Sequence, residues 1–172
     1  AASVTVIGRR IVGLATARAL LERGIEGVRV VEKEQALAQH QSTHNSGVLH
    51  AGLPYRPGSE KARLARTGIR RMTEYCRHHG IAHEICGKLV VASSPHEMAR
   101  LQEMLERGRA NGLEGLRLLE PAEAAEIEPH VRCAGAIHVP EEGIAEFAAV
   151  CRTLEEEIER RGAEVVRGAE VR

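Results

Sequence analysis

The sequence of 172 residues lacks tryptophan, and aromatic residues make up only 2% of it. Proteins that bind single-stranded nucleic acid stack bases on aromatic side chains, so this scarcity argues against such a role. Lys plus Arg equals Asp plus Glu at 24 each, which leaves no global field that favours nucleic acid or an anionic membrane. We therefore expect no nucleic-acid partner.

Long apolar runs and paired cysteines are also missing. No apolar run approaches the roughly 20 residues that cross a bilayer, and no charged-then-apolar signal segment opens the sequence. We expect no transmembrane segment, although peripheral membrane contact and the oligomeric state stay open. The four cysteines form no C-x-x-C pair and are expected to be reduced, mostly buried thiols of a cytoplasmic protein: Cys76, Cys86, Cys133 and Cys151.

The N-terminal stretch has the order strand, glycine-bearing turn, helix and second strand. Residues 4–7 form a short apolar run, residues 14–23 continue a helix, and residues 28–31 give a strand that ends in Glu32. This order is the βαβ unit that holds the ADP half of FAD or NAD, with the acid placed for the ribose hydroxyls. The sequence therefore predicts an α/β fold with a Rossmann-like unit at its start.

The turn of this unit departs from the G-x-G-x-x-G spacing. In that pattern the first glycine allows the tight turn, the second lets the backbone approach the pyrophosphate, and the third lets helix and strand pack closely. Gly8 and Gly13 stand at the first and third positions, whereas Arg10 stands at the second. A side chain at this place takes space that the pyrophosphate needs, although the charge of an arginine attracts phosphate.

Further helices and strands are predicted from the spacing of apolar residues and from Gly, Pro and Ser residues at the ends of elements. A long polar segment, residues 39–59, separates them from the first unit. They are a helix at 60–79, a strand at 89–92, a helix between Ser94 and Gly112, a short helix from Glu120, a strand at 136–139, a helix at 145–161 and a strand at 163–166.

The polar segment contains the most specific pattern in the chain. Residues 40–53 read HQSTHNSGVLHAGL and are followed by PYRPGSEKA; CGKLVVA at 86–92 and EEGI at 141–144 come later in the same order. This set resembles the L-2-hydroxyglutarate oxidase/dehydrogenase family, a branch of the FAD-dependent D-amino-acid-oxidase-like oxidoreductases. The resemblance covers essentially the whole chain but only the N-terminal part of a family member.

The resemblance implies a two-domain flavoprotein that oxidises L-2-hydroxyglutarate, or a similar small 2-hydroxy acid, to the 2-oxo acid with FAD as cofactor. By the same resemblance, Gly8 and Gly13 hold the pyrophosphate turn and Glu32 the adenosine ribose. The loop that runs past the pyrophosphate toward the flavin is lined by Ser42, Asn45, Ser46 and Gly47. Small polar residues can offer N–H groups and hydroxyls there without crowding the flavin.

The resemblance also predicts an interrupted domain. We expect residues 1–85 to be the first part of an FAD-binding domain and residues 86–143 to be part of an inserted α+β substrate domain. Residues 144–172 are expected to return to the first sheet. Since the chain ends soon after a strand, we expect a truncated protein that lacks a complete active site.

His50 is the candidate catalytic residue, because it follows the loop at its flavin end. An imidazole there could take the hydroxyl proton of the substrate or contact it, since its ordinary pKa is near neutrality. A covalent link to FAD and a purely structural role are the alternatives, and a structural role is also the simplest interpretation of His40 and His44. His78, His79 and His83 lack the spacing of metal ligands, so no metal site is predicted.

Arg9 and Arg10 stand where the family has glycines. If that backbone needs left-handed dihedral angles, each non-glycine residue costs roughly 1–2 kcal/mol. We therefore expect a much reduced FAD affinity, and we expect glycine at both positions to raise it without altering the fold. Two other functions stay open: a catalytically inactive α/β fragment, and a related FAD-dependent amine or glycerol-phosphate oxidoreductase.

Overall fold

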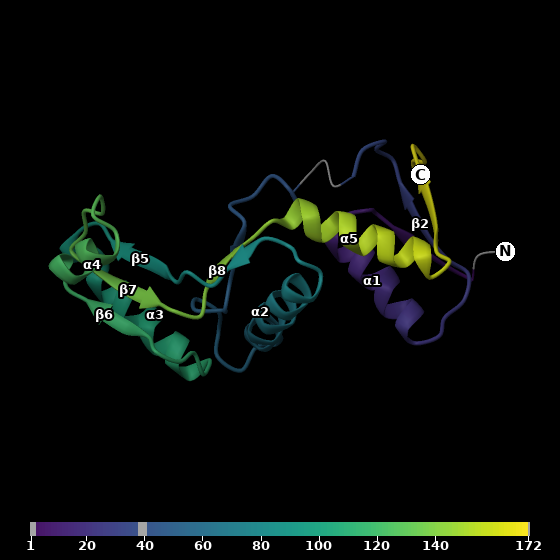
Figure 1. The fold of residues 1–172 in the computed structure, drawn as a ribbon. Helices are drawn as coiled ribbons and strands as arrows, with labels where there is room; N and C mark the ends of the chain where they lie inside the picture. Colours follow the sequence, from purple (N-terminus) through teal and green to yellow (C-terminus); the bar gives the residue numbers. More distant parts are fainter. Residues whose placement is uncertain (1–2, 38–40, 172) are drawn as a thin grey trace. The chain divides into compact units, whose positions relative to one another are not determined.

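The computed structural model of the protein describes residues 3–37 and 41–171 (Figure 1). The chain divides into two compact units. Unit 1 comprises Ala1–Gly47, His79–Ala82 and Glu146–Arg172, and unit 2 comprises Val48–His78 and His83–Ala145.

The described residues of unit 1 form a parallel sheet and two helices. These elements are β1 (Val4–Ile7), α1 (Ile11–Glu22), β2 (Val28–Glu32), α5 (Phe147–Arg160) and β9 (Glu164–Arg167). The sheet has the order β1-β2-β9, with Val4 opposite Val28 and Val30 opposite Val165. The predicted return of the last strand to the first sheet is therefore confirmed, and α1 packs against α5 (Figure 1).

Helix α5 packs onto the rest of unit 1 through an apolar stripe on one of its faces. Its buried apolar residues Val150, Cys151, Leu154 and Ile158 recur at helical spacing, so one face is removed from water. Gly162, with φ of +88°, follows the helix where a left-handed residue commonly ends one. The same helix also buries two carboxylates, Glu155 and Glu157, which require charged partners.

Unit 2 consists of two antiparallel sheets and its own helices. Its elements are β3 (Val48–Leu49), α2 (Glu60–His78), β4 (His83–Glu84), β5 (Lys88–Ala92), η1 (Pro95–Glu97), α3 (Met98–Ala110), β6 (Arg117–Leu119), α4 (Pro121–Ile127), β7 (Gly135–Val139) and β8 (Gly143–Ala145). The strand orders are β3-β8-β4 and β5-β7-β6. Leu119, Ala124 and Ala136 form a core on which Leu89 packs.

The α/β class predicted from the sequence is confirmed by the parallel sheet of unit 1 and its helices. The domain ranges 1–85, 86–143 and 144–172 stay predictions, because a compact unit is not by itself a cofactor or a substrate domain. None of the helices in the described part of the chain combines the length and apolar character that crossing a bilayer requires.

Candidate functional site

The glycine-bearing turn after β1 depends on close contact between Gly8 and Gly13. Gly8 has φ of +106°, and its N–H donates to the carbonyl of Val31 at 2.8 Å. A Cβ on Gly13 would lie 1.9 Å from the carbonyl oxygen of Gly8. Only glycine lets α1 start this close to the strand, which is the packing expected of the third glycine of the pattern.

Arg10 occupies its position without backbone strain. It is the N-cap of α1 with φ of −98° and ψ of 175°, an extended conformation that any residue adopts. The condition under which an arginine here would cost strain energy is therefore not met. The predicted conflict between Arg10 and the pyrophosphate is therefore steric only. The exposed side chain of Arg10 lines the hollow described below.

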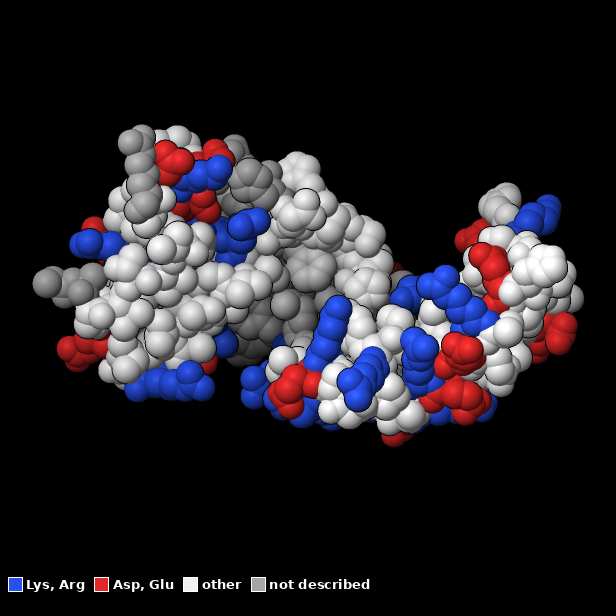
Figure 2. Space-filling model, turned by 180° about the vertical axis from the view of Figure 1, so that it is seen from behind, with Lys and Arg blue, Asp and Glu red and all other residues white. Residues whose placement is uncertain are grey.

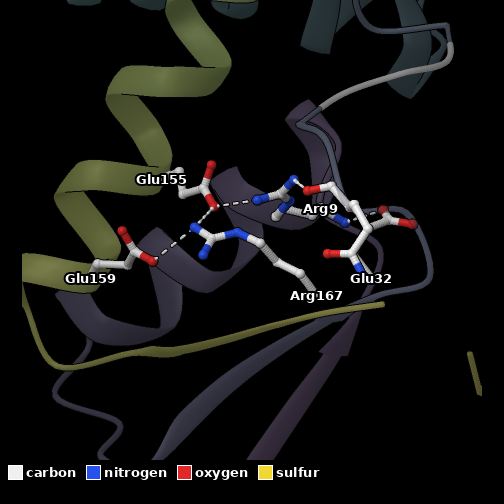
Figure 3. Close-up of polar contacts among 6 residues, drawn as sticks. Arg9, Glu32, Glu155, Glu159 and Arg167 are labelled. Atoms are coloured by element: carbon white, nitrogen blue, oxygen red, sulfur yellow. Dashed lines mark hydrogen bonds and ion pairs between the residues drawn. The ribbon is translucent and has the colours of Figure 1, made fainter. Parts of the chain in front are cut away.

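Arg9 has a different environment, inside unit 1 (Figure 3). Its side chain is 2% exposed, and its Nη1 forms an ion pair with Glu155 Oε1 at 2.7 Å. Its Nη2 donates to the carbonyl of Gln35 at 3.1 Å. Glu155 Oε1 also pairs with Arg167 at 2.8 Å. Arg9 is thus a structural residue that fixes the turn to α5, and of the two arginines Arg10 is the one that lines the hollow described below.

Glu32 ends β2 with its carboxylate held by the backbone. Its Oε2 accepts the N–H of Arg9 at 2.9 Å, and its Oε1 accepts the N–H of Glu34 at 3.2 Å. Burial alone would raise the pKa of Glu32, but these hydrogen bonds, one from the Lys33 N–H and the charge of Arg9 together hold it below its usual value. The group is an ionised acceptor, and each oxygen keeps acceptor capacity for a ribose hydroxyl.

An open hollow of about 430 Å³ lies at the ends of β1 and β2. It is lined by Ile7, Gly8, Arg10, Val31, Glu32, Lys33, Ala169, Glu170 and Val171. Parallel α/β sheets bind ligands at the carboxyl ends of their strands, which is where this hollow is. The structure therefore brings Gly8 and Glu32 together at one site.

The predicted loop residues divide into two groups. Ser42 reaches the start of α1, where its Oγ accepts the N–H of Ile11 at 3.2 Å, one of the N–H groups that a helix leaves free. Asn45 instead makes local contacts, with Gln41 O at 2.8 Å and Gly47 N at 2.7 Å. Asn45, Ser46 and Gly47 do not line the hollow. Their cofactor role stays a prediction, and His40 lies outside the described residues.

His50 lies in unit 2, directly after β3. Its Nδ1 is 3.5 Å from Oε2 of Glu142 and 3.5 Å from Nζ of Lys88. Glu142 is fully buried, and its Oε1 accepts the N–H of Ala51 at 2.9 Å. Sequence reasoning named His50 but missed these two neighbours, although Lys88 and Glu142 both belong to segments that carry the family resemblance.

A second hollow, of about 390 Å³, lies along α2. Its lining includes Arg66, Arg70 and Arg77 with Glu74 and Glu141. Figure 2 shows Lys and Arg side chains gathered on one face of the molecule beside acidic ones. This mixture of charges is that of a solvated helix face.

The possible metal ligands and the four cysteines form no functional site among the described residues. The described residues contain no group of three His, Cys, Asp or Glu arranged to hold a metal ion. All four cysteines are free, with Cys76 and Cys151 buried and Cys86 exposed. Burial raises the pKa of the Cys151 thiol to about 11, so this thiol is poorly reactive.

Named relatives match this chain over almost all of its length. L-2-hydroxyglutarate dehydrogenase, mitochondrial, of Homo sapiens is 41% identical over 170 residues, covering 98% of this chain and 37% of that protein. L-2-hydroxyglutarate dehydrogenase of Indibacter alkaliphilus is 38% identical over 169 residues, covering 98% and 42%. The chain thus spans about two fifths of the length of these relatives.

Solved structures of flavoproteins share the fold. The L-alpha-glycerophosphate oxidase of Mycoplasma pneumoniae, solved with FAD bound, superposes with a TM-score of 0.87 at 24% identity, covering 97% of this chain and 44% of that one. Glycine oxidase of Bacillus cereus gives 0.84 at 23% identity, covering 99% and 47%. At these identities the likeness shows the architecture alone.

The family itself is established by a match along the whole described chain. The DAO family model, described as FAD dependent oxidoreductase, matches residues 3–172. The glycine-bearing βαβ unit and the acid at the end of β2 agree with that match. This chain belongs to the DAO family of FAD dependent oxidoreductases.

Proposed function

We propose that this chain takes part in the FAD-dependent oxidation of L-2-hydroxyglutarate, or of a similar 2-hydroxy acid, to the 2-oxo acid. The observation that carries the proposal is the 41% identity with human L-2-hydroxyglutarate dehydrogenase over 170 residues. The solved neighbours, at 24% identity or below, carry no argument about the substrate.

The hollow of unit 1 fits the ADP half of FAD. Glu32 provides the ribose acceptor, and Gly8 and Gly13 provide the tight turn and the start of α1 that face a pyrophosphate. Ser42 holds the first turn of α1 in place through the N–H of Ile11. The side chain of Arg10 takes up space that the phosphates of FAD would need, so we expect FAD to bind weakly there.

Bound FAD supplies the acceptor for the hydride that leaves C2 of the hydroxy acid. The residue of this chain proposed to meet the reacting hydroxyl is His50, whose side chain is 53% exposed. The ring acts as a proton acceptor or as a hydrogen-bond donor, depending on which nitrogen carries the proton. A covalent link from His50 to FAD is the alternative role.

The first test is a flavin-fluorescence titration of the chain with FAD, followed by an assay with an artificial electron acceptor. We expect saturable FAD binding by the chain itself. Because the chain spans about two fifths of the length of its relatives, turnover is assayed in the protein extended to their full length, where we expect dye reduction with L-2-hydroxyglutarate but none with D-2-hydroxyglutarate, glycine or glycerol 3-phosphate. Glu32→Gln should weaken FAD binding, whereas Glu164→Gln at an exposed position of β9 should not.

Each outcome decides between the functions left open. Absence of FAD binding supports the inactive α/β fragment and rejects the proposal. FAD binding with oxidation of glycine or glycerol 3-phosphate in place of the hydroxy acid supports the amine or glycerol-phosphate oxidoreductase. FAD binding without turnover of any of these substrates by the extended protein rejects the proposed activity.

The cytoplasmic location also stays a proposal. The human relative is named as mitochondrial, whereas the name of the Indibacter relative gives no compartment. Fractionation of cells that produce the chain from its own gene tests the location.

A further inference from the structure

Glu142 is a buried carboxylate that joins three segments of unit 2. Its side chain is 0% exposed. Its Oε1 accepts the N–H of Ala51, its Oε2 forms an ion pair with Nζ of Lys88, and its backbone carbonyl accepts the N–H of Gly87 at 2.8 Å. A buried carboxylate is costly unless it is paired and hydrogen-bonded, so these contacts fix its position and that of Lys88.

The register of β3 on β8 brings His50 to this carboxylate. Leu49 pairs with Gly143 in an antiparallel ladder, so His50 and Glu142 are the next residues beyond the last pair. The Nδ1 atom of His50 lies 3.5 Å from both Lys88 Nζ and Glu142 Oε2. Because Nδ1 faces this ion pair, Nε2 is the nitrogen that remains for a ligand.

Lys88 and Glu142 favour opposite protonation of Nδ1. An ammonium only donates and favours a lone pair on Nδ1, whereas a carboxylate only accepts and favours an N–H there. The Lys88 contact has the alignment of a hydrogen bond, although 3.5 Å is long for one. The Glu142 contact is an ion-pair distance, and that oxygen is already engaged by Lys88. The arrangement thus favours donation from Lys88 to Nδ1.

We propose that Lys88, held by Glu142, is a positioning residue that keeps neutral His50 unprotonated at Nδ1 and protonated at Nε2. In this tautomer Nε2 presents an N–H donor, which suits a carboxylate or hydroxyl oxygen of a small hydroxy acid. Nε2 then has no lone pair to take a proton, so His50 is a substrate contact and not the base. The substrate class rests on the proposed function, whereas the tautomer does not.

The experiment is ¹⁵N NMR of the histidine rings, with His50 assigned by its loss in His50→Gln. Spectra are recorded at about pH 8.5, two units above the ordinary histidine pKa, so that rings are neutral. We expect the Nε2–H form of His50 to exceed the Nδ1–H form by about ten-fold, which is about 1.4 kcal/mol. The exposed His96 of the same chain serves as the solvent reference.

Variants separate the effect of Lys88 from the preference of any exposed imidazole. Lys88→Met should lower the Nε2–H excess at least five-fold, and Lys88→Arg should retain it. Since Lys88→Met leaves Glu142 buried without its cation, the double variant Lys88→Met with Glu142→Gln provides a neutral background, in which His50 should match His96. Lys61→Met, at the lysine over the Tyr55 ring, is the control and should change nothing.

A dominant Nδ1–H form of His50 in the wild-type chain overturns the proposal. The proposal is also overturned if neither Lys88→Met nor the double variant changes the ratio of the Nε2–H form to the Nδ1–H form. Neither FAD nor substrate enters this measurement. If His50 has the expected tautomer but the hydroxy acid is not oxidised, the proposed function is rejected while the inference about Lys88 and His50 stands.

Discussion

The Nη1 atom of Arg9 and the Oε1 atom of Glu155 lie 2.7 Å apart inside unit 1, on side chains that are 2% and 9% exposed. Arg9 belongs to the turn after β1, and Glu155 lies 146 residues further along the chain, in α5. Removal of one partner from a buried ion pair leaves an uncompensated charge in the interior. The pair therefore ties the glycine-bearing turn to α5 and gives Arg9 a structural role.

Arg9→Met is expected to lower the free energy of unfolding by about 2–3 kcal/mol, because among the described residues Glu155 then keeps only the more exposed Arg167 as an ion-pair partner. Urea denaturation followed by circular dichroism measures the change. Arg10→Met is the matched control and should stay within about 0.5 kcal/mol of the wild type, since Arg10 is exposed. Equal stability of the two variants would show that the buried pair contributes nothing.

Arg10→Gly is expected to raise FAD affinity by about ten-fold or more, which corresponds to about 1.4 kcal/mol. The reason is steric, because the side chain lines the hollow at the position where the family pattern has a glycine. Flavin-fluorescence titration measures the affinity, with Arg10→Lys as a variant that keeps the charge and most of the bulk. A weaker affinity in Arg10→Gly would mean that the charge of Arg10 attracts the phosphates more than its bulk obstructs them.

Glu32→Gln is expected to destabilise the chain at pH 7 but not in acid. Both carboxylate oxygens of Glu32 accept backbone N–H groups, and an amide NH₂ in place of one oxygen would face a donor. The pKa of Glu32 in the folded chain is lowered from its ordinary 4.5, so ionisation contributes stability above that value. This contribution is lost as the pH falls through the lowered pKa.

The measurement is the difference in free energy of unfolding between wild type and Glu32→Gln from pH 7 down to pH 3. The difference should be constant near neutrality and shrink below pH 4.5, the ordinary value. A difference that grows as the pH falls would contradict a lowered pKa. Glu164→Gln, at an exposed carboxylate of β9, serves as the control.

Local pattern predicted the regular elements of this fold well. The helix expected at 60–79 is α2 (Glu60–His78), and the strand expected at 163–166 is β9 (Glu164–Arg167), one residue later. Apolar periodicity and glycine stops depend on neighbouring residues, so a single sequence contains them. The two-residue strands β3 and β4 were not predicted, because they form only where β8 pairs with both.

In the candidate site, too, local patterns were predictable from the sequence and contacts between distant segments were not. The spacing of Gly8 and Gly13 predicted their close packing, since that pattern is local. The different orientations of Arg9 and Arg10 were not predictable, because the partner that buries Arg9 is Glu155 on a distant helix. Glu142 and Lys88 escaped notice because pairing between distant strands brings them to His50. The pairing of β3 with β8 places Glu142 there, and the pairing of β5 with β7, with the Gly87 N–H on the Glu142 carbonyl, places Lys88 there.

Two helical glycines provide a final, paired prediction. Gly13→Ala is expected to destabilise unit 1 by about 2–3 kcal/mol, because its Cβ would lie 1.9 Å from the Gly8 carbonyl oxygen and α1 would have to move away. Gly68→Ala in α2 places its Cβ in open space and should stabilise the chain by about 0.5–1 kcal/mol through helix propensity. Urea denaturation measures both changes.

FAD titration of the same two variants separates packing from ligand binding. The Gly8 carbonyl belongs to a residue that lines the hollow of unit 1, so a shift of α1 in Gly13→Ala should also weaken FAD binding. Gly68→Ala should leave FAD affinity unchanged, because Gly68 lies in unit 2 and its Cβ meets no neighbouring atom. A Gly13→Ala variant as stable as the wild type would refute the close approach of α1 to the turn, on which the nucleotide site proposed for unit 1 depends.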